Sequence, residues 1–241
     1  MNIIKLDAID STNRYLKDVS RATSLQNFVV VHAKNQTHGK GQMGAKWISK
    51  SGKNLTMSIL IKDVVKDIQQ IFDLNVAVAC SVLSVLQTFD IPNLSIKWPN
   101  DIMSDNKKIG GILIENLVNA QQIVAVVGIG INVNQTDFGA LKQASSLLNE
   151  SKIFFDIDKL VLAITENIIE NIQKFSESSD FFWQQYHAVL FKKDLPTLFE
   201  NIDKSRFLGM IKEVSRNGKL VVLLENDSLK SFEVKQIKML F

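Results

Sequence analysis

The sequence predicts an α+β fold: a mixed β-sheet with helices, followed by a smaller β-rich part at the carboxyl end. Two observations carry this prediction. Short aliphatic segments of strand length alternate, over residues 1–190, with longer segments whose apolar residues recur at helical spacing. After Leu195-Pro196 the helical spacing stops and only short strand-like segments remain. We therefore place a main domain at residues 1–190 and a small domain at residues 191–241.

The elements of the main domain follow from these patterns. The predicted strands are Phe28–Ala33, Leu55–Ile61, Ser95–Trp98, Gly111–Glu115 and Ile123–Val133. Two helices are predicted, Ile68–Phe89 and Asp158–Phe175. Each carries an apolar stripe, formed by Leu74, Val78, Val82, Val85 and Phe89 in the first and by Leu160, Ile164, Ile168 and Ile172 in the second. Such stripes are typical of helices packed on a core, and we expect both on one face of the sheet.

The small domain is predicted to be a β-barrel made of short strands. The candidates are Leu208–Val214, Leu220–Leu224 and Leu229–Val234. The first two are joined through Asn217-Gly218, a strong hairpin signal. So small a β structure has little stability alone, and we expect it to dock on the main domain.

Composition narrows the class of protein. Hydrophobic residues make up 46% of the 241 residues, enough for a full core. Lysine and arginine number 28 against 25 aspartates and glutamates, without a basic stripe, which argues against nucleic acid as a partner. No apolar run is long enough to cross a membrane, and residues 1–7 lack the form of a signal peptide. We therefore expect a cytoplasmic protein.

The reactive and metal-binding residue types are sparse. The single cysteine, Cys80, lies in an apolar helical segment, so we expect a core residue and no internal disulfide. The three histidines are scattered, and no cluster with the spacing of zinc ligands is found. We predict no resident metal.

The most informative motif is K-W-P-N-D at residues 97–101, followed by K-K-I-G-G-I-L-I-E at residues 107–115. Pro99 favours an extended residue before it, and the Asn-Asp pair that follows favours a turn. The glycines then lead into an aliphatic strand, so Lys108 lies at the mouth of a buried strand, well placed to neutralise an anion. The alternative is an ordinary hairpin with a solvated lysine pair.

A second motif, Q-T-H-G-K-G-Q-M-G-A-K-W at residues 36–47, contains G-x-G-x-x-G. A strand-like segment follows it instead of a helix, which excludes a Rossmann fingerprint. A glycine loop with Lys40, Lys46 and Trp47 is suited to folding over a phosphate and a base, although a flexible surface loop has the same composition. A third motif, D-S-T-N at residues 10–13, predicts a helix N-cap, whose polar groups are also able to bind a small ligand.

These motifs, with G-I-G-I-N-V-N at residues 128–134, occur in one order and at compatible spacings. Together they closely resemble the biotin–protein ligases, also called biotin–[acetyl-CoA-carboxylase] ligases. The likeness covers nearly the whole chain, with the motifs between Asp10 and Asn134. It implies a fold like the class II synthetases and biotinyl/lipoyl ligases for the main domain, and an SH3-like barrel for the small one.

The resemblance implies a two-step reaction. Biotin and ATP form biotinyl-5′-AMP, and a lysine of a biotin carboxyl carrier domain then takes the biotin. The implied catalytic residues are Lys108, whose charge would lie between the two anions, Asp101, which would orient or deprotonate the acceptor amine, and Lys40. Mg²⁺ is implied with ATP and would be held mainly by the nucleotide.

The binding residues are implied in the same way. Biotin would contact Ser11, Thr12, Asn13, Gln36, Lys40, Gly41, Gln42, Lys108 and Gly110, and the adenylate would contact Gly39, Gly44, Trp47, Asn100 and Asn132. The chain departs from the usual family loop G-R-G-R-x-G-R at Lys40, Gln42 and Ala45. Lysine lacks the two parallel hydrogen bonds that an arginine side chain can donate, so these differences bear on how tightly the adenylate is held.

Three expectations complete the analysis. Because D-S-T-N lies so close to residue 1, we expect no DNA-binding domain before it and no DNA partner. An exposed edge of the sheet is compatible with a monomer or weak homodimer. Two alternatives stay open: a lipoate–protein ligase, against which K-W-P-N-D argues, and a non-catalytic ligand- or peptide-binding module, against which Lys108 and Asp101 argue. Exchange between ATP and pyrophosphate with biotin or lipoate separates all three.

Overall fold

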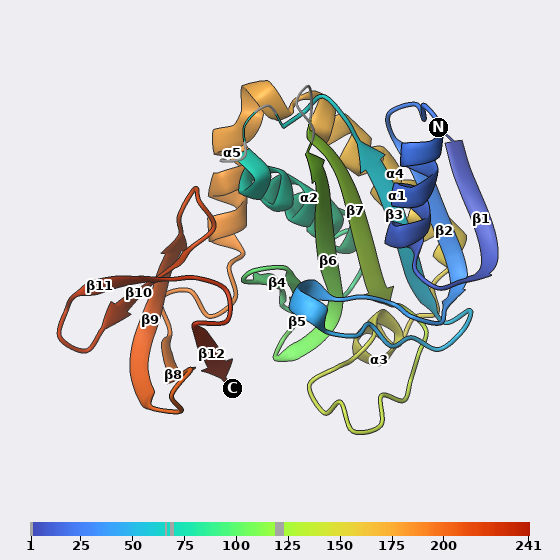
Figure 1. The fold of residues 1–241 in the computed structure, drawn as a ribbon. Coiled ribbons are helices and arrows are strands. Elements are labelled where there is room, and N and C mark those ends of the chain that lie inside the picture. Colours follow the sequence, from blue (N-terminus) through green and yellow to red (C-terminus); the bar gives the residue numbers. More distant parts are fainter. Residues whose placement is uncertain (1, 66, 68–69, 119–122) are drawn as a thin grey trace.

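The computed structural model describes residues 2–65, 67, 70–118 and 123–241. A seven-stranded sheet with helices forms the larger part, and a second, five-stranded sheet stands beside it (Figure 1). The order of the first sheet is β1-β2-β3-β7-β6-β5-β4. Its strands are β1 Asn2–Ile9, β2 Val29–Gln36, β3 Asn54–Ile61, β4 Leu94–Lys97, β5 Asp101–Ser104, β6 Lys107–Val118 and β7 Ile123–Asn132. β1 and β2 pair in parallel and the other described pairs are antiparallel, which confirms the mixed sheet.

Helices cover both faces of this sheet, not one. On one face lie α2 Ile71–Leu86, α4 Ile157–Gln173 and α5 Phe175–Ala188, on the other lies α1 Thr12–Ala22, and a short helix, α3, spans Leu147–Ser151 (Figure 1). Leu16 of α1 is fully buried with a small apolar cluster that includes Val31, Leu60 and Val126. The reason is that the central strands are apolar on both faces, so each face needs a cover.

The predicted elements are present, with shifted ends. Both predicted helices form, as α2 and α4; residues 68–69, at the start of the first predicted range, lie outside the described residues. Further elements were not predicted: β1, β5, α5, and the two strands β8 and β12 of the second sheet. Cys80 is buried in α2, where burial raises the pKa of its thiol to about 12, as expected of an inert core residue. No helix in the described part of the chain is long and apolar enough to cross a membrane.

The second sheet has the order β11-β10-β9-β8-β12, all antiparallel. Its strands are β8 Pro196–Asn201, β9 Arg206–Val214, β10 Leu220–Leu224, β11 Leu229–Phe232 and β12 Ile237–Leu240. The β9–β10 hairpin turns at Asn217-Gly218, as predicted, with Gly218 at φ +79°. This turn anchors the second sheet on the first: Trp98 Nε1 donates to Gly218 O at 2.9 Å, and Phe72 of α2 lies against Gly218.

Candidate active site

The floor of the site is created by glycines in β7. Along this strand alternate residues face opposite sides of the sheet, and Val127, Ile129 and Ile131 face the core under α2 and α4. On the α1 side, Val126 is followed by Gly128 and Gly130 instead of larger residues. The missing side chains leave a hollow beside the start of α1.

Added methyl groups would fill that hollow. A Cβ built on Gly128 would lie 2.4 Å from Asn13 Oδ1, and one on Gly130 would lie 2.6 Å from Trp47 Cε2. Gly130 pairs with Gly111 of β6, which continues the floor sideways. The glycines are thus required because other groups approach the backbone closely.

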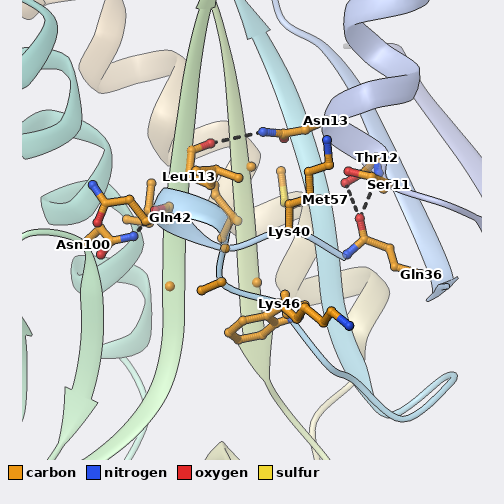
Figure 2. Close-up of a pocket in the computed structure, with 18 of the residues that line it drawn as sticks. Ser11, Thr12, Asn13, Gln36, Lys40, Gln42, Lys46, Met57, Asn100 and Leu113 are labelled. Carbon is orange, nitrogen blue, oxygen red and sulfur yellow. Dashed lines mark hydrogen bonds between the residues drawn. The ribbon is translucent and has the colours of Figure 1, made fainter. Parts of the chain in front are cut away.

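A cavity of about 220 Å³ lies over this floor, between α1, the glycine loop and β6 (Figure 2). The residues that line it are Ser11, Thr12, Asn13, Gln36, Lys40, Gly41, Gln42, Ala45, Lys46, Trp47, Met57, Asn100, Asp101, Lys108, Gly111, Ile112, Leu113, Gly128, Ile129 and Gly130. It is apolar along the sheet and polar at the α1 end, toward which the Lys40 ammonium also points (Figure 2), and it is charged at the β5–β6 end. This is the composition of a small-molecule site with a few placed polar groups.

The polar end is a hydrogen-bonded group built on the start of α1. Ser11 is the N-cap, and the Thr12 backbone N–H donates to Gln36 Oε1 at 2.8 Å (Figure 2). The fully buried Ser58 hydroxyl lies 2.7 Å from Thr12 Oγ1 and 2.6 Å from Asn13 Oδ1. These mutual bonds fix the direction in which each polar atom faces the cavity.

Asn13 is oriented from behind by a charged pair. Its Nδ2 donates to Glu115 Oε2 at 2.8 Å, and Lys17 Nζ lies 2.6 Å from the other oxygen of that carboxylate. Burial acts to raise the pKa of Glu115, but the hydrogen bonds from Lys17 and Asn13 outweigh it, and the pKa lies below its ordinary value. Glu115 therefore stays ionised and accepts from Asn13, which leaves the Asn13 carbonyl oxygen turned to Ser58.

The charged end is built by the hairpin of K-W-P-N-D. β4 and β5 pair so that Lys97 lies opposite Asp101, and the Trp98–Pro99 peptide bond between them is cis. Asp101 Oδ1 lies 2.5 Å from Lys108 Nζ, and its Oδ2 lies 3.8 Å from Lys97 Nζ. Burial lowers the pKa of Lys97, against the opposing pull of Asp101. Two lysines thus enclose one carboxylate at the edge of the cavity.

A second cavity, of about 530 Å³, continues the site past this charged end. Trp47, Asp101 and Lys108 line both cavities, and the second adds Lys97, Lys142, Phe138, Phe241 and Asn132 among others. The Trp47 indole lies over Gly130, and its buried Nε1 has no hydrogen-bond partner in the described part of the chain. Lys108 Nζ is 5.9 Å from the centre of the Trp47 ring.

The glycine loop closes the cavity from outside. Lys40 and Lys46 face each other in a β-bridge, and Trp47 N donates to Gly39 O at 2.9 Å. At its tip Met43 has φ +53°, a conformation that costs energy for a side chain with a Cβ. Lys235, in the turn between β11 and β12, donates to Met43 O at 3.0 Å, so the carboxyl-terminal part of the chain contacts the glycine loop.

Comparison with known proteins identifies the relatives of this arrangement. The model of the biotin/lipoate A/B protein ligase family matches residues 6–134, more than half of the chain. The chain belongs to this family.

Individual relatives of the family agree. The bifunctional ligase/repressor BirA of Salmonella typhimurium is 28% identical over 235 residues, which are 95% of this chain and 71% of that protein. The biotin–[acetyl-CoA-carboxylase] ligase of Mycobacterium tuberculosis is 31% identical over 151 residues, 60% of this chain and 55% of that protein. The solved biotin protein ligase of Aquifex aeolicus in complex with biotin and ATP is 26% identical, with TM-score 0.81 over 99% of this chain and 98% of that one. The chain spans about half the length of several curated relatives.

Within this ligase fold, most residues predicted for the site lie together. Eleven of them line the first cavity: Ser11, Thr12, Asn13, Gln36, Lys40, Gly41, Gln42, Trp47, Asn100, Asp101 and Lys108. Asn132 lines the second cavity, where its Nδ2 donates to Ser145 O. Three predicted glycines line neither cavity. Gly39 is buried in the loop against Trp47, Gly110 faces Ile131 in the core, and Gly44 is at the exposed loop tip.

Sequence reasoning missed several residues that build or support the cavity. Gly128 and Gly130 were quoted only as part of a motif, although two glycines two apart in an aliphatic strand indicate a hollow on one face. Lys97 and Glu115 were also quoted only within motifs, and Ser58 has no local signal, because its partners Thr12 and Asn13 are distant in the sequence. Among the described residues, no group of three or more histidines, cysteines or carboxylates is arranged to hold a metal ion.

Proposed function

We propose that this chain is an ATP-dependent biotin–protein ligase. It joins biotin to ATP as biotinyl-5′-AMP, with release of pyrophosphate, and transfers the biotin to a lysine of a biotin carboxyl carrier domain. The observation that carries the proposal is one continuous site with a polar end, a glycine floor and a lysine–carboxylate end. The likeness to a ligase crystallised with biotin and ATP supports it.

Biotin lies with its ring system over the glycine floor in this proposal. Its ureido group meets the polar atoms of Ser11, Thr12, Asn13 and Gln36, whose directions are held by their mutual hydrogen bonds. The nearby charges of Lys17 and Glu115 are paired with each other, and the Lys40 ammonium adds a hydrogen-bond donor at this end. Gly41 and Gln42 cover the ligand from the loop.

Lys108 supplies the positive charge for adenylation. The biotin carboxylate attacks the α-phosphorus of ATP and pyrophosphate leaves, so negative charge accumulates where two anions meet. A fixed ammonium at that place stabilises the transition state more than the separated substrates. The Asp101 carboxylate, 2.5 Å away, holds Lys108 in position.

Asp101 then serves the transfer step. The acceptor amine attacks the acyl carbon of the mixed anhydride, AMP leaves, and the nitrogen loses one proton. Asp101 is the carboxylate that lines both cavities, which places it to orient that amine and accept the proton.

The second cavity holds the adenosine part in this proposal. Trp47 and Asn132, which line it, are assigned to the adenylate, together with Asn100 of the first cavity and the loop residues Gly39 and Gly44, which line neither cavity. The protein offers few oxygen ligands for Mg²⁺, because the Asp101 carboxylate is already paired with two lysines. The ion supplies charge neutralisation on ATP and would take most of its oxygen ligands from the phosphates, with Asp101 and Asn100 beside it.

Exchange of labelled pyrophosphate into ATP tests the proposal. Exchange that depends on biotin, with none on lipoate, is the expected result. Exchange with lipoate alone would make the chain a lipoate ligase, and no exchange with either acid would contradict adenylation altogether. We further propose a cytoplasmic location. We also propose a monomer or weak homodimer, and gel filtration at several protein concentrations checks this oligomeric state.

A further inference from the structure

The polar group at the start of α1 has more close oxygen–oxygen contacts than protons to fill them. The contacts join Thr12 Oγ1 to Gln36 Oε1 at 3.0 Å, Ser58 Oγ to Thr12 Oγ1 at 2.7 Å, and Ser58 Oγ to Asn13 Oδ1 at 2.6 Å. The two hydroxyl groups supply one proton each, so one of the three contacts lacks a proton. We propose that Glu115 decides which contact that is, and that the two acceptor oxygens left there select an acid whose ring carries an N–H group. The proposal rests on the proposed ligase function and concerns how that site chooses its acid.

Glu115 fixes the direction of the Asn13 amide. Asn13 Nδ2 lies 2.8 Å from Glu115 Oε2 and 3.3 Å from Leu113 O, and both of these atoms are acceptors while Glu115 is ionised. Burial acts to raise the pKa of Glu115, but hydrogen bonds from Lys17 and Asn13 outweigh it and hold the pKa below its ordinary value. The amide nitrogen of Asn13 therefore faces Glu115, and its Oδ1 faces Ser58 as an acceptor.

The hydroxyl protons then have one favourable arrangement. Asn13 Oδ1 brings no proton, so the 2.6 Å contact is filled by the proton of Ser58. Ser58 is fully buried and out of reach of a ligand, so its 2.7 Å contact with Thr12 takes the proton of Thr12. Gln36 Oε1 supplies none, because it accepts from the Thr12 backbone N–H at 2.8 Å. Thr12 Oγ1 and Gln36 Oε1 thus remain 3.0 Å apart without a proton between them.

This unfilled contact lies where a ligand is able to reach it. Thr12 and Gln36 both line the first cavity (Figure 2). A ligand N–H placed there donates to these oxygens, whereas a ring without N–H leaves them unpaired in an enclosed site, which costs binding free energy. The ureido ring of biotin has two N–H groups and the dithiolane ring of lipoate has none. Glu115 itself lines neither cavity, so it is a positioning residue that acts through Asn13 and Ser58.

Two variants alter the arrangement at different points. In Glu115→Gln, the ammonium of Lys17 attracts the new amide oxygen, and the new amide nitrogen then faces Asn13 and turns its amide round. In Ser58→Ala, the proton of Thr12 is free to fill the contact with Gln36. The matched control is Thr56→Val, because Thr56 is buried on the same face of β3 as Ser58, donates to Ala33 O, and lines neither cavity.

Calorimetry without ATP measures Kd for biotin and for two biotins that are each methylated on one ureido nitrogen. Wild type should prefer biotin over the analogue that lacks the recognised N–H. We expect this preference to fall about three- to tenfold in Glu115→Gln and in Ser58→Ala, the effect of one hydrogen bond. The double variant should show no further fall, since both changes act on the same protons. Thr56→Val should keep the preference even if its melting temperature falls.

The ratio of the Kd values separates positioning from a merely structural role. An equal loss of affinity for all three ligands in both single variants, or additive losses in the double variant, would overturn the role of Glu115. Biotin-dependent pyrophosphate exchange by the unaltered chain is measured in parallel. Biotin binding that depends on N–H and on Glu115, without any exchange, would support the positioning role and overturn the proposed ligase function alone.

Discussion

At the scale of single residues, the pair of Lys108 and Asp101 is the group on which the proposed chemistry depends most. Lys108→Ala should lower biotin-dependent pyrophosphate exchange by two to three orders of magnitude, as expected for loss of one electrostatic stabiliser. Lys107→Ala is the matched control, since Lys107 is exposed and donates to Lys142 O at 2.6 Å, outside the cavities. Near-normal exchange in Lys108→Ala, with an unchanged melting temperature, would remove Lys108 from the mechanism.

The stability of the folded protein should depend on pH through Glu115, which supports the polar end of the site. Its folded pKa lies below its ordinary value of 4.5, so its contribution to stability is present above pH 4.5 and is lost as the pH falls through the folded pKa. Glu115→Gln cannot pair with Lys17 as an ion, so it should be less stable than wild type at pH 7. Urea midpoints of both proteins should converge as the pH falls below 4.5. A difference that does not change with pH would show that Glu115 is not favoured in its charged form.

At the scale of elements, the loop from Thr37 to Lys46 controls access to the cavity. It has few apolar anchors and is held by the Lys40–Lys46 bridge, a few backbone hydrogen bonds and Lys235, so its opening costs little free energy. Amide exchange in this loop should be fast in the free protein and slow with biotin and ATP bound, while exchange in β7 should change little. Equal protection in both states would argue against a ligand-closing loop.

The same loop bears on retention of the adenylate. Gln42 lines the cavity and brings no charge, where the usual family loop has arginine. A charge-assisted hydrogen bond exceeds a neutral one by about 1–2 kcal/mol, or roughly ten- to thirtyfold in retention. Gln42→Arg should therefore slow the release of preformed biotinyl-5′-AMP, measured as a dissociation rate at matched salt. Release as fast as in wild type would mean that Lys40 or Lys46 already supplies the charge.

At the scale of the whole molecule, the β9–β10 turn holds the two sheets together. Trp98, in the K-W-P-N-D hairpin, is buried and donates to Gly218 O. Trp98→Phe should lower the free energy of unfolding by about 1–3 kcal/mol, because a buried carbonyl loses its donor. Thr165→Val is a useful comparison, since the buried Thr165 hydroxyl donates within α4, to Val161 O at 2.7 Å. Only Trp98→Phe should increase proteolytic release of the second sheet; equal release would place the anchor elsewhere.

Local patterns were sufficient for most of the architecture. Aliphatic runs of strand length identified the central strands, and helical spacing identified α2 and α4, because these elements are buried in the core. Asn217-Gly218 identified its hairpin because few residues adopt that turn. β1, β8 and β12 were missed because strands at or near a sheet edge need few buried apolar residues, and their pairing is not recorded in a local pattern.

The sequence by itself determined the family likeness and the residue types of the site, since D-S-T-N, K-W-P-N-D and the glycine loop are contiguous. Only the tertiary structure decided that Asn13 is oriented by Glu115, that Lys97 shares Asp101 with Lys108, and that Lys235 contacts the glycine loop. The first depends on the face that α1 covers, the second on the pairing of β4, β5 and β6, and the third on how the second sheet lies beside the first. A one-dimensional pattern records which residues are apolar or charged, but which of them meet is set by how the elements pack.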